Sequence, residues 1–239
     1  QRRAATSQES TLQPDKTLAG QPVPDPGQRR QPPESAGFTA AARLIASRHN
    51  VSPKRLCAPG PTGEQLQSLL MLAAAAPDHG LLTPWRFVIV PAGQRHRLGE
   101  AFARALIERD PGATVEQLDA AREKAQRSPL LLFCIARLDP DENNAAALER
   151  TVSLGAAIQN MLLGAHALGF GAGLTSGQAM DSTPIRQLLH LAADETAVCC
   201  LNIGTVTQPG KPARQRPLPD QFVSVLTDNA APASKPDAS

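Results

Sequence analysis

The chain has 239 residues, of which 41% are hydrophobic and 19% charged, and this length suits one large domain or two small ones. The formal net charge of +2 is too small to indicate a nucleic-acid or membrane-surface partner on electrostatic grounds. No apolar run in the sequence reaches the length of a membrane span, and the first residues lack the charged-then-apolar pattern of a signal peptide.

The four cysteines show no C-x-x-C spacing, and three of them lie in apolar runs: Cys134, Cys199 and Cys200, with Cys57 standing apart. This pattern predicts buried free thiols, a reducing and therefore cytoplasmic compartment, and no zinc site.

The two ends of the chain differ from its body. Residues 1–36 contain six prolines and no Ile, Phe, Met or Trp, so they cannot bury enough apolar surface to offset the entropy of ordering. We therefore expect a disordered N-terminal extension over 1–36, a single domain over 37–226 and a disordered tail over 227–239.

Periodicity and capping signals predict the elements of this body in order. The predicted helices are 38–48, 62–75 with Thr62 as N-cap, 94–108, one opened by a Thr114–Gln117 capping box, 144–168 ending at Gly169, and 183–189; the predicted strands are 86–90, 130–136 and 197–206. Helices outnumber strands and the two do not alternate regularly, which favours an α+β fold.

Small residues occupy the middle of the predicted helix 144–168, among them Gly155, Ala156 and Gly164. Such a helix is expected to be packed closely on every side, and so to be central or to lie at a subunit interface.

The segment 76–87 leads through a Pro-Asp-His-Gly turn into an apolar strand and holds the only Trp. Trp85 and Arg86 lie where the loop becomes a strand, a usual place for ligand-contacting side chains. The alternative is that Trp85 belongs to the core and the turn has no further role.

Three other segments carry possible chemistry. Arg48-His49-Asn50, followed by Lys54-Arg55, could hold a phosphate or could be a cationic helix C-terminus. The glycine-rich segment 169–177 follows a helix, so it does not fit a dinucleotide-binding motif; it permits close approach to a flat ligand, or is a helix stop and loop. The basic segment 211–216 could complete a phosphate site or be a solvated loop.

Taken together, these segments resemble the FMN-dependent nitroreductases, most closely their small NAD(P)H nitroreductase branch. The resemblance covers nearly all of the body and rests mainly on Ala-Pro-Asp-His-Gly…Pro-Trp-Arg-Phe at 76–87, with support from 155–160, 169–171 and 202–205. It implies a mixed, mainly antiparallel sheet flanked by helices with a long central helix. It also implies a homodimer with FMN at the subunit interface.

The resemblance assigns cofactor-binding positions residue by residue. The family's phosphate element falls on Arg48, His49 and Asn50, its flavin-contacting histidine on His79, and the stretch after the glycine loop on Leu174, Thr175 and Ser176. The basic residues that would complete the phosphate site are Lys211, Arg214 and Arg216. The chain departs from the family at His49 and Asn50, and at Leu174 and Thr175, where an aromatic ring and an arginine are usual.

The implied activity is transfer of hydride from NAD(P)H through FMN to a small electron-poor acceptor such as a nitroaromatic or a quinone. The flavin supplies this chemistry, so no catalytic residue is assigned; His79 or Arg86 would place positive charge near its pyrimidine edge. Two alternatives remain: a degenerate homologue that serves as a binding or scaffolding protein, and a flavin-fragmenting or dehalogenating relative.

Overall fold

The computed structural model describes residues 35–138, 146–207 and 216–226. Its contacts divide the chain into a unit over 1–39, of which only the beginning of one helix is described, and a unit over 40–239 that holds the fold. The helices are α1 (Ala36–Ser47), α2 (Gly63–Ala74), α3 (Arg95–Arg109), α4 (Val115–Glu123), α5 (Ala147–Ala167) and α6 (Thr183–Leu188). The strands are β1 (Leu56–Cys57), β2 (Trp85–Ile89), β3 (Leu130–Arg137), β4 (Gly171–Thr175) and β5 (Glu195–Val206).

Local signals in the sequence position most of these elements. Capping boxes begin α2 at Thr62 and α4 at Thr114, where each threonine side chain accepts from the amide three residues later. Residues 144–145 of the predicted long helix lie outside the described residues, and α5 begins at Ala147. Strands β1 and β4 were not predicted.

The strands form one sheet in the order β1-β5-β3-β2, with β4 also paired to β5. Every pairing among the described strands is antiparallel. The predicted α+β fold with a mainly antiparallel sheet is therefore confirmed.

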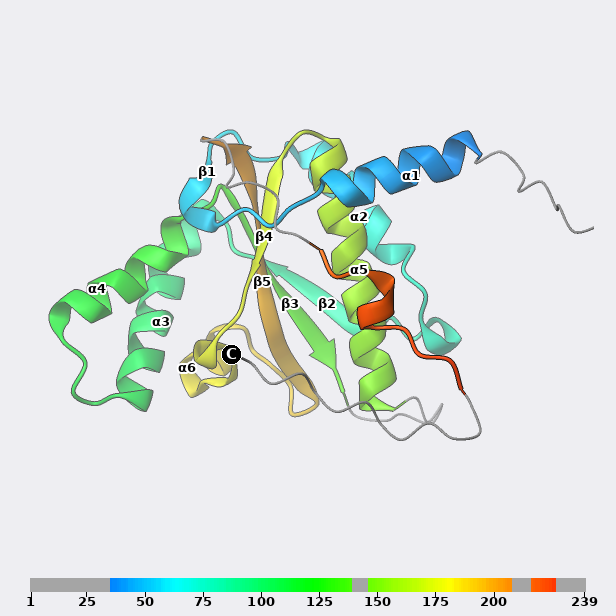
Figure 1. Cartoon of the computed structure of the whole chain (residues 1–239). Helices are drawn as coiled ribbons and strands as arrows, with labels where there is room; N and C mark the ends of the chain where they lie inside the picture. The colour runs from blue at the N-terminus through cyan, green and yellow to red at the C-terminus, as the bar shows by residue number, and fades with distance from the viewer. Residues whose placement is uncertain (1–34, 139–145, 208–215, 227–239) are drawn as a thin grey trace, which may run out of the picture. The chain divides into compact units, whose positions relative to one another are not determined.

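Helices cover both faces of the sheet (Figure 1). One core lies between the sheet and the helices α2 and α5, and the other lies between the sheet and the helices α3 and α6. Alternate residues of β3 serve the two cores, since Leu132 and Cys134 face α5 whereas Leu131 and Phe133 face the opposite side.

Trp85 belongs to the α5-side core and is 6% exposed. Its proposed role in contacting a ligand is therefore wrong, and the core alternative is correct. The indole packs where β2 begins because this residue shares the face of Phe87, which also packs against that core.

Only one face of the long helix α5 is buried in the core. Ala157, Met161 and Ala165 are fully buried, and a Cβ on Gly164 would overlap the side chain of Leu72. Gly155, in contrast, is exposed and has open space around it, so the expectation of close packing on every side holds for only part of the helix. No helix in the described part of the chain is long and apolar enough to cross a membrane.

Candidate functional site

Two segments that are far apart in the sequence meet beside β4. The side chain of Asn50 accepts a hydrogen bond from the backbone amide of Leu174 at 3.0 Å, and the amide of Val51 donates to the carbonyl of Ala172 at 2.9 Å. The predicted phosphate element is thus attached to the strand that carries the predicted ring-contacting residues.

This attachment requires the glycines of β4. A Cβ on Gly173 would overlap the carbonyl oxygen of Val51 and lie 3.0 Å from Asn50 Oδ1. Within the segment 169–177, residues Gly171–Thr175 therefore form a strand that permits this close approach, and the prediction of a loop over all of the segment is wrong. Only its beginning is a helix stop, where Gly169 has a φ of +85°.

A cavity of about 390 Å³ opens on the α3 side of the sheet, next to β4. It is bounded by η1 (Pro53–Arg55), α3, the end of α4 with η4 (Lys124–Gln126), and η5 (Gln178–Asp181). Its lining includes Thr175 and Ser176 from the predicted site, and Ser52, two residues beyond Asn50. Its apolar walls are Phe102, Leu106, Leu131, Met180 and Cys200.

The cavity is electropositive. Arg109, Lys124 and Arg127 line it, and none of the described lining residues is a carboxylate. Arg127 contacts the exposed Glu123 at 3.6 Å through Nη2, but its buried Nε has no hydrogen-bond partner within the described chain. Because a buried donor without a partner is costly, this arrangement favours a ligand with acceptor oxygens.

The inner end of the cavity has a fixed polar group. Asn202, 2% exposed, accepts from Ser128 Oγ at 2.9 Å and donates to Thr175 Oγ1 at 3.0 Å. These two bonds set the orientation of the amide, and therefore also that of the Thr175 hydroxyl.

Cys200 lies opposite Thr175 in the β4–β5 pairing and lines the same cavity. Burial raises the pKa of this thiol to about 12, so it stays protonated near neutral pH. It therefore serves as apolar wall and not as a thiolate nucleophile.

His79 lies in η2 (His79–Leu81) and does not line this cavity; its contact with Glu149 places it near the beginning of α5. Its Nδ1 contacts Glu149 Oε1 at 3.0 Å, and both side chains are about half exposed, at 50% and 49%. Within one chain, His79 is therefore separated by the sheet from the cavity that Thr175 and Ser176 line.

Arg86 is engaged elsewhere. Its guanidinium donates to both carboxylate oxygens of Glu195, at 2.6 and 2.7 Å, and to the carbonyl of Leu189 at 3.3 Å. The suggestion that Arg86 faces a flavin is therefore wrong, because its side chain joins β2 to β5 and to the end of α6.

The other predicted positions are dispersed. Arg48 is half-buried at the end of α1 and His49 is exposed, with its Nδ1 3.4 Å from the carbonyl of Ser47. Leu174 is not part of the cavity lining. Arg216 is exposed, whereas Lys211 and Arg214 lie outside the described residues.

Sequence reasoning missed Lys124, Arg127 and Arg109, which bring positive charge to the cavity. All three sit in or next to helices whose charge pattern is that of a solvated face, so no sequence signal indicates that they share a cavity with β4. Among the residues that the structure describes, no group of three or more His, Cys, Asp or Glu side chains could hold a metal.

Comparison with known proteins gives the context of this site. A family model described as "Nitroreductase family" matches residues 46–205. The chain belongs to the nitroreductase family. The match runs from the end of α1 to the end of β5, and so includes every described residue of the cavity and excludes Arg216.

Curated nitroreductase relatives are similar over most of their length. A protein of Escherichia coli K12 named "Putative NAD(P)H nitroreductase YdjA" is 30% identical over 184 residues, which cover 77% of this chain and 98% of that protein. A "Putative NAD(P)H nitroreductase" of Haemophilus influenzae is 31% identical over 165 residues, covering 69% and 88%. The names of these homologues, together with the family match, support an oxidoreductase activity for this chain.

Solved nitroreductase structures share the fold. A nitroreductase-like protein from Bacillus cereus superposes with a TM-score of 0.66 at 20% identity, covering 77% of this chain and 95% of that one. A protein from Desulfovibrio desulfuricans described as a "putative nitroreductase in complex with FMN" gives a TM-score of 0.57 at 21% identity, covering 78% of this chain and 96% of that one. The FMN-dependent nitroreductase NfnB of Mycobacterium smegmatis, in complex with NADPH, gives 0.59 at 17% identity, covering 79% and 99%.

Proposed function

We propose that the chain is an FMN-dependent oxidoreductase that takes hydride from NAD(P)H and passes it to a small electron-poor acceptor, such as a nitroaromatic or a quinone. The observation that carries this proposal is the electropositive cavity beside β4, in which the buried Nε of Arg127 lacks a partner within the described chain. Family membership and the FMN and NADPH in two solved relatives support it.

The cavity residues fit a flat heterocycle with one polar edge. Leu131, Met180 and Cys200 offer apolar contact, while Asn202 with Thr175 and Arg127 with Lys124 offer hydrogen bonds. The terminal phosphate would lie toward Arg48, since Ser52 lines the cavity and Asn50 is fixed to β4.

FMN, when bound, supplies the hydride chemistry. The chain would hold and orient the ring through β4, and Lys124 and Arg127 would stabilise negative charge that develops on its polar edge. The α3–α4 wall would keep water out of the cavity. Cys200 takes no covalent part because its thiol stays neutral.

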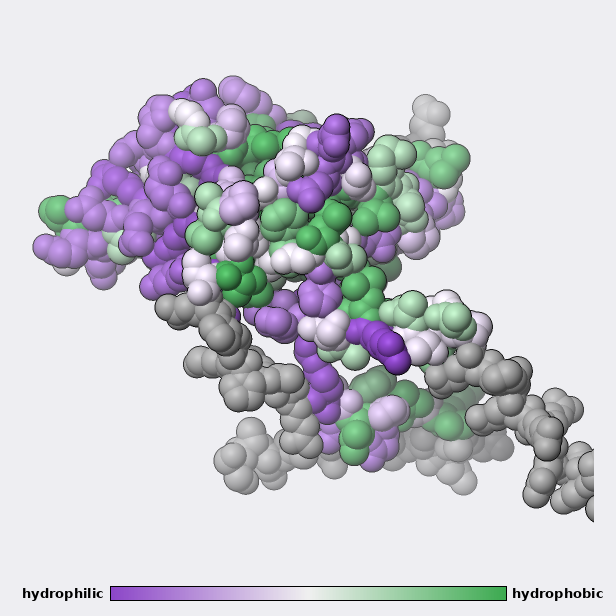
Figure 2. Space-filling model, turned by 90° about the horizontal axis from the view of Figure 1, so that it is seen from above, coloured by the Kyte–Doolittle hydropathy of each residue, from purple (hydrophilic) through white to green (hydrophobic). Residues whose placement is uncertain are grey.

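We propose a homodimer in which the second copy brings its His79 to this cavity, because His79 is separated from the cavity of its own chain. The apolar residues Leu148 and Val152 are 75% and 66% exposed on α5, and α5 begins beside His79. The α4 side is largely hydrophilic (Figure 2), so we assign the apolar part of the interface to α5.

We also propose a cytoplasmic location, since all four thiols are free although Cys134 and Cys199 are direct partners across the strands β3 and β5.

The test begins with the flavin. The purified protein should be yellow and should release FMN, not FAD, on denaturation. The Arg48→Ala variant should bind FMN about tenfold more weakly, because a charge-assisted hydrogen bond to phosphate is lost, and excess FMN should restore its turnover.

His79→Ala should mainly lower the rate of NAD(P)H oxidation at saturating FMN, without a matching loss of FMN affinity. A colourless protein that binds no added FMN in a titration would refute the proposed function and favour a degenerate binding or scaffolding homologue. Normal turnover of His79→Ala would refute the role of that residue.

A further inference from the structure

The cavity has cations at both ends of its α3 wall. Arg95, in the first turn of α3, donates to the carbonyl of Ala125 at 2.8 Å and so holds η4, with Lys124, near the beginning of the helix. Arg109 is the last residue of the same helix, about 20 Å further along its axis at 1.5 Å per residue. The cations assigned to the flavin therefore do not account for Arg109.

Arg109 is exposed and lies on the face of α3 that lines the cavity. Phe102, Leu106 and Arg109 are spaced four and three residues apart, which places them on one helical face, and all three line the cavity. From this face an aromatic ring could contact Phe102 and Leu106 while a polar substituent reaches the guanidinium.

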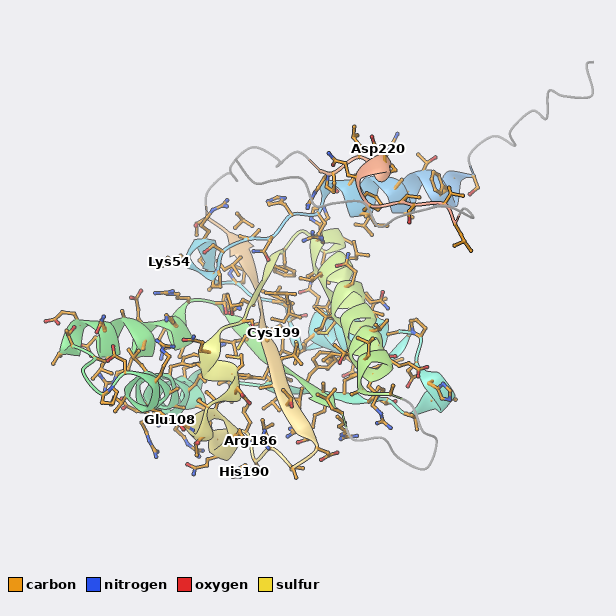
Figure 3. The ribbon with its side chains drawn as sticks, turned by 60° about the horizontal axis from the view of Figure 1, so that its bottom comes forward. Lys54, Glu108, Arg186, His190, Cys199 and Asp220 are labelled. Atoms are coloured by element: carbon orange, nitrogen blue, oxygen red, sulfur yellow. The ribbon has the colours of Figure 1, made fainter. Side chains whose placement is uncertain are left out.

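The last turn of α3 is firmly positioned. Thr183 donates to Glu108 from its hydroxyl at 2.6 Å and from its backbone amide at 3.2 Å, which attaches this turn to the beginning of α6; Figure 3 shows Glu108 on α3. Asp110, on the other side of Arg109, accepts from the amide of Gly112 at 3.1 Å.

Both neighbouring carboxylates are thus already hydrogen-bonded. Within the described ranges, Arg109 itself forms no ion pair. A favourable interaction with the helix dipole would explain a cation at this position, but not its place in the lining of a cavity that lacks carboxylates.

We propose that Arg109 forms an anion-binding subsite that makes the cavity select aromatic acceptors carrying a carboxylate, sulfonate or phosphate group. The proposal rests on the proposed function. The same anionic oxygens could come from the phosphates of NAD(P)H. Because the flavin ring would share this cavity of about 390 Å³, only a small, single-ring acceptor would fit beside it.

The experiment compares 4-nitrobenzoate with 4-nitrobenzamide, which share the ring and the nitro group and differ in charge. With NADPH and the FMN-loaded protein, the KM for the benzoate should be lower. Arg109→Gln should raise this KM about two- to fivefold, as expected for an exposed ion pair, and should change the KM for the benzamide much less.

Arg104→Gln is the matched control, since Arg104 is an exposed arginine of α3 that does not line this cavity. It should leave the preference unchanged. The absence of a preference in the native protein, an equal change for both acceptors in Arg109→Gln, or an equal effect of Arg104→Gln would overturn the proposal. So would an effect of Arg109→Gln confined to the KM for NADPH, which would assign the subsite to the dinucleotide.

Equilibrium titration of both compounds without a reductant separates this subsite from the proposed activity. If the native protein and Arg104→Gln bind the benzoate more tightly than the benzamide and Arg109→Gln does not, the subsite is supported. If the native protein then reduces neither compound, that second result refutes the proposed function alone. Equal binding of the two compounds to the native protein would overturn the subsite alone.

Discussion

Among the ion pairs of the described residues, the one between Arg86 and Glu195 has the shortest contact, at 2.6 Å. Glu195 is 7% exposed on its side chain, and its hydrogen bonds with Arg86 hold its pKa at about 2, below the ordinary value of 4.5. Because the folded-state pKa is lowered, the pair stabilises the fold fully above pH 4.5, and this stabilisation is lost as the pH falls toward 2.

We expect Arg86→Met to lower the free energy of unfolding at pH 7 by about 3 kcal/mol, since it leaves a buried carboxylate with less compensation. The difference from the native protein should shrink between about pH 5 and pH 2, which denaturant titrations across that range would measure. Arg122→Met, which removes exposed pairs with Glu100 and Asp119, is the control and should have a much smaller effect. Equal losses at pH 7 and pH 3 would contradict the assigned pairing.

Single residues were predictable from the sequence where the signal was local. The turn before β2 and the motif at 76–87 were visible in the sequence, yet the direction of the Arg86 side chain was not. That direction depends on Glu195, 109 positions away. The cations of the cavity were missed for the same reason, because only the packed fold brings α3 and η4 beside β4.

At the scale of elements, helices were easier to predict than the glycine strand. The helices α2 and α4 have capping boxes within their own sequence, whereas β4 reads Gly-Ala-Gly-Leu-Thr and lacks the alternation of a typical strand. It is a strand because β5 pairs with it on one side while the segment 50–51 approaches it closely. Such tertiary contacts leave no periodic pattern in the sequence.

Gly173→Ala should therefore be destabilising by about 1–3 kcal/mol, as for other overpacked sites, because the added methyl group overlaps the carbonyl of Val51. It should also weaken FMN binding by displacing Asn50. Thermal unfolding and an FMN titration would measure the two effects.

Gly63→Ala is the control for this substitution. It adds the same methyl group to an exposed position at the beginning of α2 with open space around it, and should be neutral or stabilising by about 0.4–1 kcal/mol. If Gly173→Ala is as stable as Gly63→Ala, the close approach at β4 does not exist in solution.

At the scale of the molecule, the exposed apolar residues of α5 predict the dimer interface. Val152→Glu should shift the protein toward monomer at micromolar concentration, as measured by light scattering, because it places a charge in an apolar contact. Val115→Glu on α4 is the matched control, because Val115 is 67% exposed and Val152 is 66% exposed. This substitution should leave the dimer intact. A native protein that is only monomeric would refute the proposed assembly.

The predicted N-terminal extension, 1–36, lies almost wholly outside the described residues, and its disorder stays a prediction. Deleting it removes only the first residue of α1 and no Ile, Phe, Met or Trp. We expect the FMN dissociation constant of the shortened protein to stay within a few-fold of the native value in a fluorescence titration. A large loss of affinity would mean that this segment contributes to the site.

The attachment of Asn50 and Val51 to β4 also bears on how fast a bound ligand could leave. A ligand that touched both segments could not be released by movement of the 50–51 segment alone, since its side-chain and backbone bonds to β4 would have to break together. The residence time of the ligand would then depend on the rate at which these two hydrogen bonds break together. Slow dissociation could thus accompany only moderate affinity, and a flavin could stay with the chain through many cycles of turnover.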